Sequence, residues 1–187
     1  MTTATKITFA RVILIPVFIV CMYLANTFGA VMHYVALAVF AIASLTDLVD
    51  GKIARKYHQV TDLGKFLDPL ADKVLVIAAM VMLCEQGLFP AWAVMIVLAR
   101  EFAVSGLRMI AASKGKVIAA GWSGKVKTAV TMTGICFMLF LNTSVFADLL
   151  GLVVLHAVNW CVIAAVSLTT LYSGIEYFIQ NRSVFEN

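Results

Sequence analysis

Five of the ten acidic residues of this chain lie in one segment of 26 residues, where their spacing could bind metal. Asp47 and Asp50 are three residues apart, and Asp68 and Asp72 are four apart. On helices, both spacings place the two carboxylates of a pair on the same face. A short turn between the two helices would make them antiparallel neighbours, so the sequence predicts that the four carboxylates converge.

Four converging carboxylates repel one another unless cations lie between them. Oxygen ligands of this kind suit Mg²⁺ or Mn²⁺, and two ions could share the site. Substrate phosphates commonly complete such coordination, which indicates pyrophosphate chemistry. Gly51 allows a substrate to approach the backbone closely. Arg55 could donate two hydrogen bonds to a phosphate or to the edge of a base. The alternative is a solvated acidic loop with salt bridges to Lys52, Arg55 and Lys65.

The composition of the chain indicates the solvent in which these residues work. The chain has 187 residues, of which 63% are hydrophobic and only 13% charged, and its mean hydropathy is +0.99. Soluble domains carry about a quarter charged residues, so we expect an integral membrane protein. At about 20 residues for each spanning helix, the length allows six crossings within a single domain, residues 1–187.

Six apolar runs mark the expected all-α architecture of six transmembrane helices. They cover Ala10–Ala25, Tyr34–Leu48, Asp72–Cys84, Trp92–Ala112, Val126–Leu141 and Leu150–Tyr172. The acidic segment lies between the second and third runs, and we expect Pro69 to open the third helix.

The basic residues predict the orientation in the membrane. With six spans, all 14 Lys and Arg residues fall on one side. The opposite connections, Asn26–His33, Glu85–Pro90 and Asn142–Leu149, carry none. The positive-inside rule then places both termini and the acidic segment in the cytoplasm. The basic residues interrupt apolar helices and form no continuous basic patch on a water-exposed surface. We therefore expect no nucleic-acid partner.

Charged residues outside the acidic segment predict a second binding region. Arg100 and Glu101 interrupt an otherwise apolar helix, and Arg108 follows two turns later. Charged residues within a membrane-spanning helix usually face a cavity or one another. The predicted phosphate-binding set consists of Arg11, Arg100, Arg108, Lys125 and Lys127. A basic pocket beside a metal site suits a ligand that carries its own phosphate.

A structural interpretation of the same charges stays open at this point. Arg100 could pair with Glu101 or with an aspartate, and Lys125 and Lys127 could reach the membrane surface and contact anionic lipid.

The acidic segment also resembles a known family. The pattern D-x2-D-G-x2-A-R-x8-G-x3-D-x3-D is matched at every fixed position by Asp47, Asp50, Gly51, Ala54, Arg55, Gly64, Asp68 and Asp72. This pattern is the signature of the CDP-alcohol phosphotransferase family, whose six-helix fold agrees with the apolar runs. The resemblance implies transfer of a phosphatidyl or similar group from a CDP-linked donor to an alcohol, with release of CMP.

The resemblance also implies roles for individual residues. The implied metal ligands are Asp47, Asp50, Asp68 and Asp72. Asp72 also matches the proposed general base for the acceptor hydroxyl. The implied contacts to the donor are Thr8, Asp50, Gly51, Arg55 and Thr61. Thr8 ends an N-x-x-T motif in which this chain has Thr5 in place of Asn.

Four further stretches, residues 6–11, 64–73, 100–108 and 124–128, are similar to bacterial members of the family that make phosphatidylglycerophosphate. This similarity implies CDP-diacylglycerol as donor, glycerol 3-phosphate as acceptor, a bacterial cell membrane and a homodimer.

Other functions fit parts of the sequence. The same chemistry could use phosphatidylglycerol, giving cardiolipin, or inositol phosphate as acceptor. A divalent-metal transporter is the alternative from another class. The carboxylates cluster at one membrane face with none near the middle of the bilayer, which counts against a transport path. A purely structural scaffold would leave the carboxylate repulsion unexplained.

Substitution of the expected base tests this interpretation. Asp72→Asn should lower the turnover number about 100-fold or more, because the acceptor hydroxyl loses the carboxylate that takes its proton. Binding of the CDP-linked lipid should stay largely intact. CMP release and lipid binding measure the two effects, and Asp148→Asn, outside the acidic segment, is the matched control. Normal turnover by Asp72→Asn would exclude Asp72 as the base.

Overall fold

The chain folds into helices, and no strand occurs in the part that the structure describes. In this computed structural model the helices are α1 (Thr3–Phe28), α2 (Ala30–Tyr57), α3 (Asp62–Glu85), α4 (Ala91–Ser113), α5 (Trp122–Leu141), α6 (Ser144–Leu150) and α7 (Leu152–Gln180). All but α6 are long. At 1.5 Å per residue, a helix of about 20 residues spans the 30 Å of a membrane core.

The structure describes residues 3–57, 62–116, 118–119 and 121–182. Within these ranges, the structure describes only the backbone of residues 3–8, 47–57, 62–69, 72, 144 and 147.

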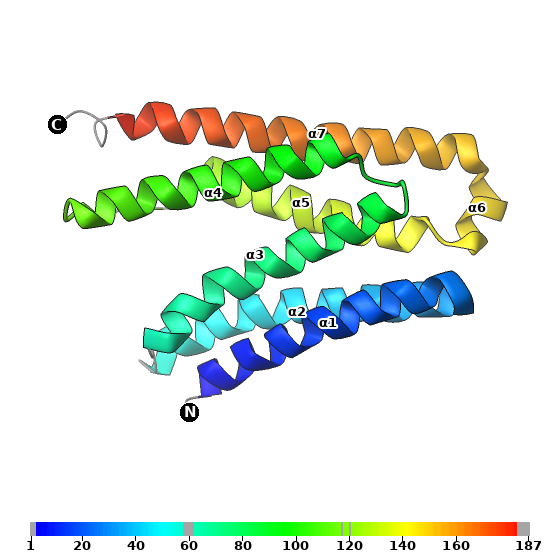
Figure 1. The fold of residues 1–187 in the computed structure, drawn as a ribbon, viewed down its shortest axis with the longest axis horizontal. Coiled ribbons are helices and arrows are strands. Elements are labelled where there is room, and N and C mark those ends of the chain that lie inside the picture. The colour runs from blue at the N-terminus through cyan, green and yellow to red at the C-terminus, as the bar shows by residue number, and fades with distance from the viewer. Residues whose placement is uncertain (1–2, 58–61, 117, 120, 183–187) are drawn as a thin grey trace.

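The long helices run alongside one another in alternating directions (Figure 1). One end of the bundle holds the start of α1, the end of α2, the start of α3, the end of α4 and the end of α7. The other end holds the α1–α2 and α3–α4 turns and α6. The three connections without Lys or Arg therefore share one end, which is the grouping that the basic residues predict.

Three of the described helices are long and apolar enough to cross a membrane: α1 over Phe9–Phe28, α5 and α7. α2 has a shorter apolar part, Ala30–Thr46. α4 falls outside this group because Arg100, Glu101 and Arg108 interrupt its apolar sequence. The chain is thus an all-helical membrane protein with three candidate spans by composition.

Apolar side chains from all six long helices form the main core. Within this core, Phe18 of α1 and Phe40 of α2 are fully buried, with ring centroids 5.8 Å apart. α4 joins this core through buried residues up to Val97. From Val104 onward, the buried residues of α4 pack instead with Tyr177 of α7 in a second cluster. α4 therefore leaves the main core for α7 along its length.

The start of α3 differs from the sequence prediction. We expected Pro69 to open this helix, but α3 begins at Asp62 and continues through Pro69. α1 likewise continues through Pro16. A proline removes one backbone hydrogen bond from a helix. In a membrane bundle, neighbouring groups can satisfy the exposed carbonyl, so the helix need not end there.

The last predicted span also differs from the structure. We expected one run from Leu150 to Tyr172, but the chain breaks at Gly151, whose φ of 78° lies in the left-handed region that favours glycine. α6 precedes this break, within a stretch that we expected to be a plain connection. α7 then continues to Gln180.

α5 and α7 approach each other closely along their length. A Cβ atom at Gly134 of α5 would lie 2.8 Å from Val162 Cγ1 and 3.5 Å from Val166 Cγ2 of α7. Further along, Asn142 and Asn159 exchange two side-chain amide hydrogen bonds of 2.9 and 2.8 Å. Small residues and interhelical amide bonds are common means of joining helices in membranes.

The close approach at Gly134 leads to a stability prediction. Gly134→Val should lower the free energy of unfolding by about 1–3 kcal/mol, because the added atoms overlap the stiff side chain of Val162. Thermal unfolding in detergent measures the effect. Gly106→Val in α4 is the control, since a Cβ there would meet nothing within 4 Å. Equal unfolding temperatures for the two variants would contradict the prediction.

Candidate active site

The predicted metal and donor site falls largely on residues whose side chains are outside the description. Asp47, Asp50, Gly51 and Arg55 lie in the final part of α2, and Asp68 and Asp72 lie in α3. Thr8 lies in α1, and Thr61 is outside the described residues. Helical backbone at both aspartate pairs agrees with the predicted sharing of a face. The connection between α2 and α3 is short, as expected.

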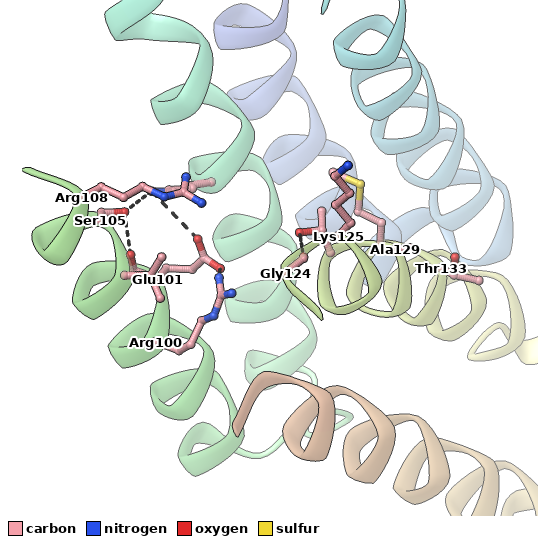
Figure 2. A pocket seen from close by; sticks show the side chains of 12 residues that line it. Arg100, Glu101, Ser105, Arg108, Gly124, Lys125, Ala129 and Thr133 are labelled. Carbon is pink, nitrogen blue, oxygen red and sulfur yellow. Dashed lines mark hydrogen bonds and ion pairs between the residues drawn. The ribbon is translucent and has the colours of Figure 1, made fainter. Parts of the chain in front are cut away.

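Next to α3, the described side chains surround a cavity of about 560 Å³. Its wall comes from Lys73 of α3, from α4 between Arg100 and Arg108, and from α5 between Gly124 and Thr133. Figure 2 shows the α4 side chains on one side of this cavity and the α5 side chains on the other. Its charged lining consists of Lys73, Arg100, Arg108, Lys125 and Glu101. With four cations and one carboxylate, the lining suits an anionic ligand.

Arg100 is held between α5 and α7. One terminal nitrogen donates to Glu101 Oε1 at 3.0 Å and the other donates to Ser173 Oγ at 2.6 Å. Gly174 leaves room for the side chain, since a Cβ there would lie 3.2 Å from Arg100 Cγ. A Cβ at Gly124 would make an ordinary contact of 3.4 Å with Nη2. The buried Nε finds no acceptor among the described residues. A ligand oxygen could satisfy this donor.

Arg108 is oriented by α7. Its Nε donates to Tyr177 Oη at 2.9 Å, and its guanidinium carbon lies 5.4 Å from the centroid of the Tyr177 ring. This combination of a hydrogen bond and a cation–π contact limits the rotamers of Arg108. Arg108 is an exposed residue, and its guanidinium keeps further N–H donors for the oxygens of a phosphate.

Glu101 balances part of the positive charge that the basic side chains bring to the cavity. Its Oε1 accepts from Lys127 Nζ at 2.7 Å and from Arg100 Nη1 at 3.0 Å. Lys73 Nζ lies 4.0 Å from its Oε2. One carboxylate thus lies among cations from α3, α4 and α5. Such an arrangement joins the three helices, because buried charges need partners in a medium of low dielectric constant.

The structure brings three of the five predicted phosphate-binding residues to the cavity: Arg100, Arg108 and Lys125. Lys127 is buried, pairs with Glu101 and lines a smaller cavity of about 40 Å³ beside α3. Two residues along a helix correspond to a turn of about 200°, so Lys125 and Lys127 face different sides of α5.

Arg11 also lies away from the cavity. It is buried in α1, where Nε donates to the carbonyl oxygen of Ala43 in α2 at 3.2 Å. The structural pairing of Arg100 with Glu101, which the sequence left open, is present, and Arg100 lines the cavity as well.

Several residues of this site were not predicted from the sequence. Lys73, Ser105, Ser173 and Tyr177 were not proposed, and Glu101 was considered only as a partner for Arg100. A signal was available in the spacing, because Glu101 and Ser105, and likewise Ser173 and Tyr177, are four residues apart on one helical face. The sequence does not show which helices these faces meet.

Comparisons with known proteins agree with the resemblance of the acidic segment. The family described as CDP-alcohol phosphatidyltransferase matches residues 1–172. A Bacillus subtilis (strain 168) protein named CDP-diacylglycerol--glycerol-3-phosphate 3-phosphatidyltransferase is 40% identical over 185 residues, covering 94% of this chain and 93% of the relative. A protein of that name from Escherichia coli (strain K12) is 36% identical, covering 96% of this chain and 94% of the relative.

Removal of the central carboxylate should destabilise the bundle. Glu101→Gln should lower the free energy of unfolding by about 3 kcal/mol, because it leaves Arg100 and Lys127 without their counter-charge. Thermal unfolding in detergent measures the loss. Glu85→Gln, at an exposed glutamate that ends α3, is the matched control. An equal unfolding temperature for Glu101→Gln and the wild-type protein would contradict a central role for this carboxylate.

Proposed function

Because this chain belongs to the CDP-alcohol phosphatidyltransferase family, we propose that it transfers the phosphatidyl group of CDP-diacylglycerol to glycerol 3-phosphate. The products are phosphatidylglycerophosphate and CMP, which makes the protein an enzyme of phospholipid biosynthesis. Relatives that match nearly the whole chain carry the name of this activity, which supports both substrates.

The observation that carries the choice of acceptor is the basic cavity beside α3. Arg100 and Arg108 present guanidinium groups that suit a phosphate, and Lys125 adds a third cation. α4 and α7 hold both arginines in place before a ligand arrives, so little ordering is required on binding. An acceptor with its own phosphate would use this cavity, whereas serine or an ethanolamine-type head group has no need of it.

In the proposed reaction, one of the two free hydroxyl oxygens of glycerol 3-phosphate attacks the phosphorus that carries diacylglycerol. A new phosphorus–oxygen bond forms, and the bond from this phosphorus to the oxygen shared with CMP breaks. CMP leaves with the bridging oxygen and its electron pair. Asp72 takes the proton of the attacking hydroxyl, which is general-base catalysis at a positioned carboxylate. No covalent intermediate with the enzyme is required.

The residues proposed to hold Mg²⁺ or Mn²⁺, as two ions, are Asp47, Asp50, Asp68 and Asp72. Carboxylate oxygens are the donors that these ions prefer, and helical spacing within each pair fits a shared site. When bound, the ions would neutralise the pyrophosphate and the charge that develops on CMP. The donor is proposed to contact Thr8, Asp50, Gly51, Arg55 and Thr61.

We place the protein in the bacterial cell membrane with six spans, including the more charged α2, α3 and α4. The grouping of the connections at two ends supports this count, since those without Lys or Arg share one end. By the positive-inside rule, the termini and the active site face the cytoplasm. Family membership supports a homodimer.

An acceptor panel with one cavity variant tests the proposal. Purified protein with CDP-diacylglycerol and Mg²⁺ or Mn²⁺ should release CMP with glycerol 3-phosphate. Arg108→Gln should raise the KM for glycerol 3-phosphate about 10- to 100-fold with little change in kcat, since it removes charge-assisted hydrogen bonds to the phosphate. Lys116→Gln, exposed beyond the end of α4, is the control and should behave as the wild type.

Other outcomes identify the alternatives. CMP release with phosphatidylglycerol or inositol phosphate but none with glycerol 3-phosphate would refute the acceptor while keeping the chemistry. No CMP release with any acceptor would refute the enzyme and favour metal transport. An unchanged KM in Arg108→Gln would remove Arg108 from the phosphate site.

A further inference from the structure

α3 and α4 separate from each other along their length. Figure 1 shows them meeting at the turn between them and diverging toward the opposite end of the bundle. The burial pattern agrees, because α4 shares the main core with α3 up to Val97 and packs with Tyr177 of α7 from Val104 onward. Among the described side chains, apolar packing therefore does not set the spacing of the two helices in the region of the basic cavity.

In this region polar contacts connect α3 to α4. Lys73 Nζ of α3 donates to Ser105 Oγ of α4, and it lies 4.0 Å from Glu101 Oε2. Ser105 in turn donates to the backbone oxygen of Glu101 at 2.7 Å, which orients its hydroxyl. We call these three residues, Lys73, Glu101 and Ser105, the α3–α4 clasp.

The clasp joins the two halves of the proposed reaction. Lys73 directly follows Asp72, the proposed base, so holding Lys73 fixes the backbone of α3 next to that base. On the other side, α4 carries Arg100 and Arg108, which are proposed to bind the phosphate of the acceptor. The distance between the acceptor hydroxyl and its base therefore depends on the α3–α4 spacing. A misplacement of about 1 Å can cost about 100-fold in rate.

We propose that Lys73 is a positioning residue, which acts through Ser105 and Glu101 to hold the helix of the base at its working distance from the acceptor site. This inference rests on the proposed function. It differs from phosphate binding, the other role open to a lysine on the wall of the cavity. A phosphate ligand would change KM, whereas a positioning residue changes kcat.

The test measures kcat and KM for glycerol 3-phosphate in Lys73→Gln, Ser105→Ala, the double variant and Lys73→Arg. Lys73→Gln should lower kcat about 10- to 100-fold with KM within about twofold of the wild type. Ser105→Ala should do the same to a smaller degree. The kcat of the double variant should equal that of Lys73→Gln, because both substitutions remove the same Lys73–Ser105 contact. Lys73→Arg, which keeps a donor, should recover part of the rate.

Two controls match the substitutions. Ser113→Ala removes a hydroxyl of α4 that, like Ser105, bonds to a backbone oxygen of its own helix, here that of Ile110. Lys116→Gln removes an exposed lysine. Both should keep the wild-type kcat. Binding of Mn²⁺ alone, followed by its electron paramagnetic resonance signal, should be unchanged in Lys73→Gln, since the proposed ligands remain in place.

A raised KM with unchanged kcat would make Lys73 a phosphate ligand and overturn the inference. Multiplicative effects of Lys73→Gln and Ser105→Ala would also overturn it, because the two residues would then act separately. Loss of Mn²⁺ binding in Lys73→Gln would assign Lys73 to the metal site instead. If the wild-type protein releases no CMP, the proposed function itself fails. Normal wild-type turnover with unchanged variants refutes the positioning role alone.

Discussion

The ion pairs of the Glu101 carboxylate are the interaction on which the cluster of basic side chains in this bundle depends. The carboxylate accepts from Lys127 of α5 and from Arg100 of α4, and Lys73 of α3 lies nearby. Cations held inside an apolar bundle need a counter-charge, because hydration is lost and the dielectric constant is low. One acidic residue therefore lets three helices bring basic side chains to the same place while the lining of the cavity keeps an excess of positive charge.

Small residues make this arrangement sterically possible. Gly174 of α7 leaves space that Arg100 occupies, and Gly134 lets α5 and α7 approach each other closely. Because lipid tails are as apolar as leucine, close packing and polar contacts hold helices together in a membrane more than hydrophobic burial does. The shape of the cavity thus follows from where side chains are absent as well as from where charges are present.

The change of partner along α4 explains why the cavity lies where it does. Near its start, α4 packs into the main core with α3, and later it packs on Tyr177 of α7. The space between the diverging helices is lined by residues of α3, α4 and α5. Tyr177 belongs to the second apolar cluster through its ring and also orients Arg108 through its hydroxyl. Packing and ligand geometry are therefore coupled through α7, a helix whose sequence predicts no functional residue.

The sequence by itself determined the helical class, the membrane setting, the acidic signature of the family and the grouping of the basic residues at one end of the bundle. These follow from local properties: apolar runs, residue spacing along one helix, and the distribution of charge. Helix ends were less predictable, because Pro69 does not end a helix whose neighbours can satisfy the backbone, and Gly151 breaks an apolar run. Only the tertiary structure decided that Arg100, Arg108 and Lys125 share a cavity, while Lys127 and Arg11 are buried elsewhere. The physical reason is that a residue's partner depends on the rotation and separation of whole helices, which packing against other helices sets.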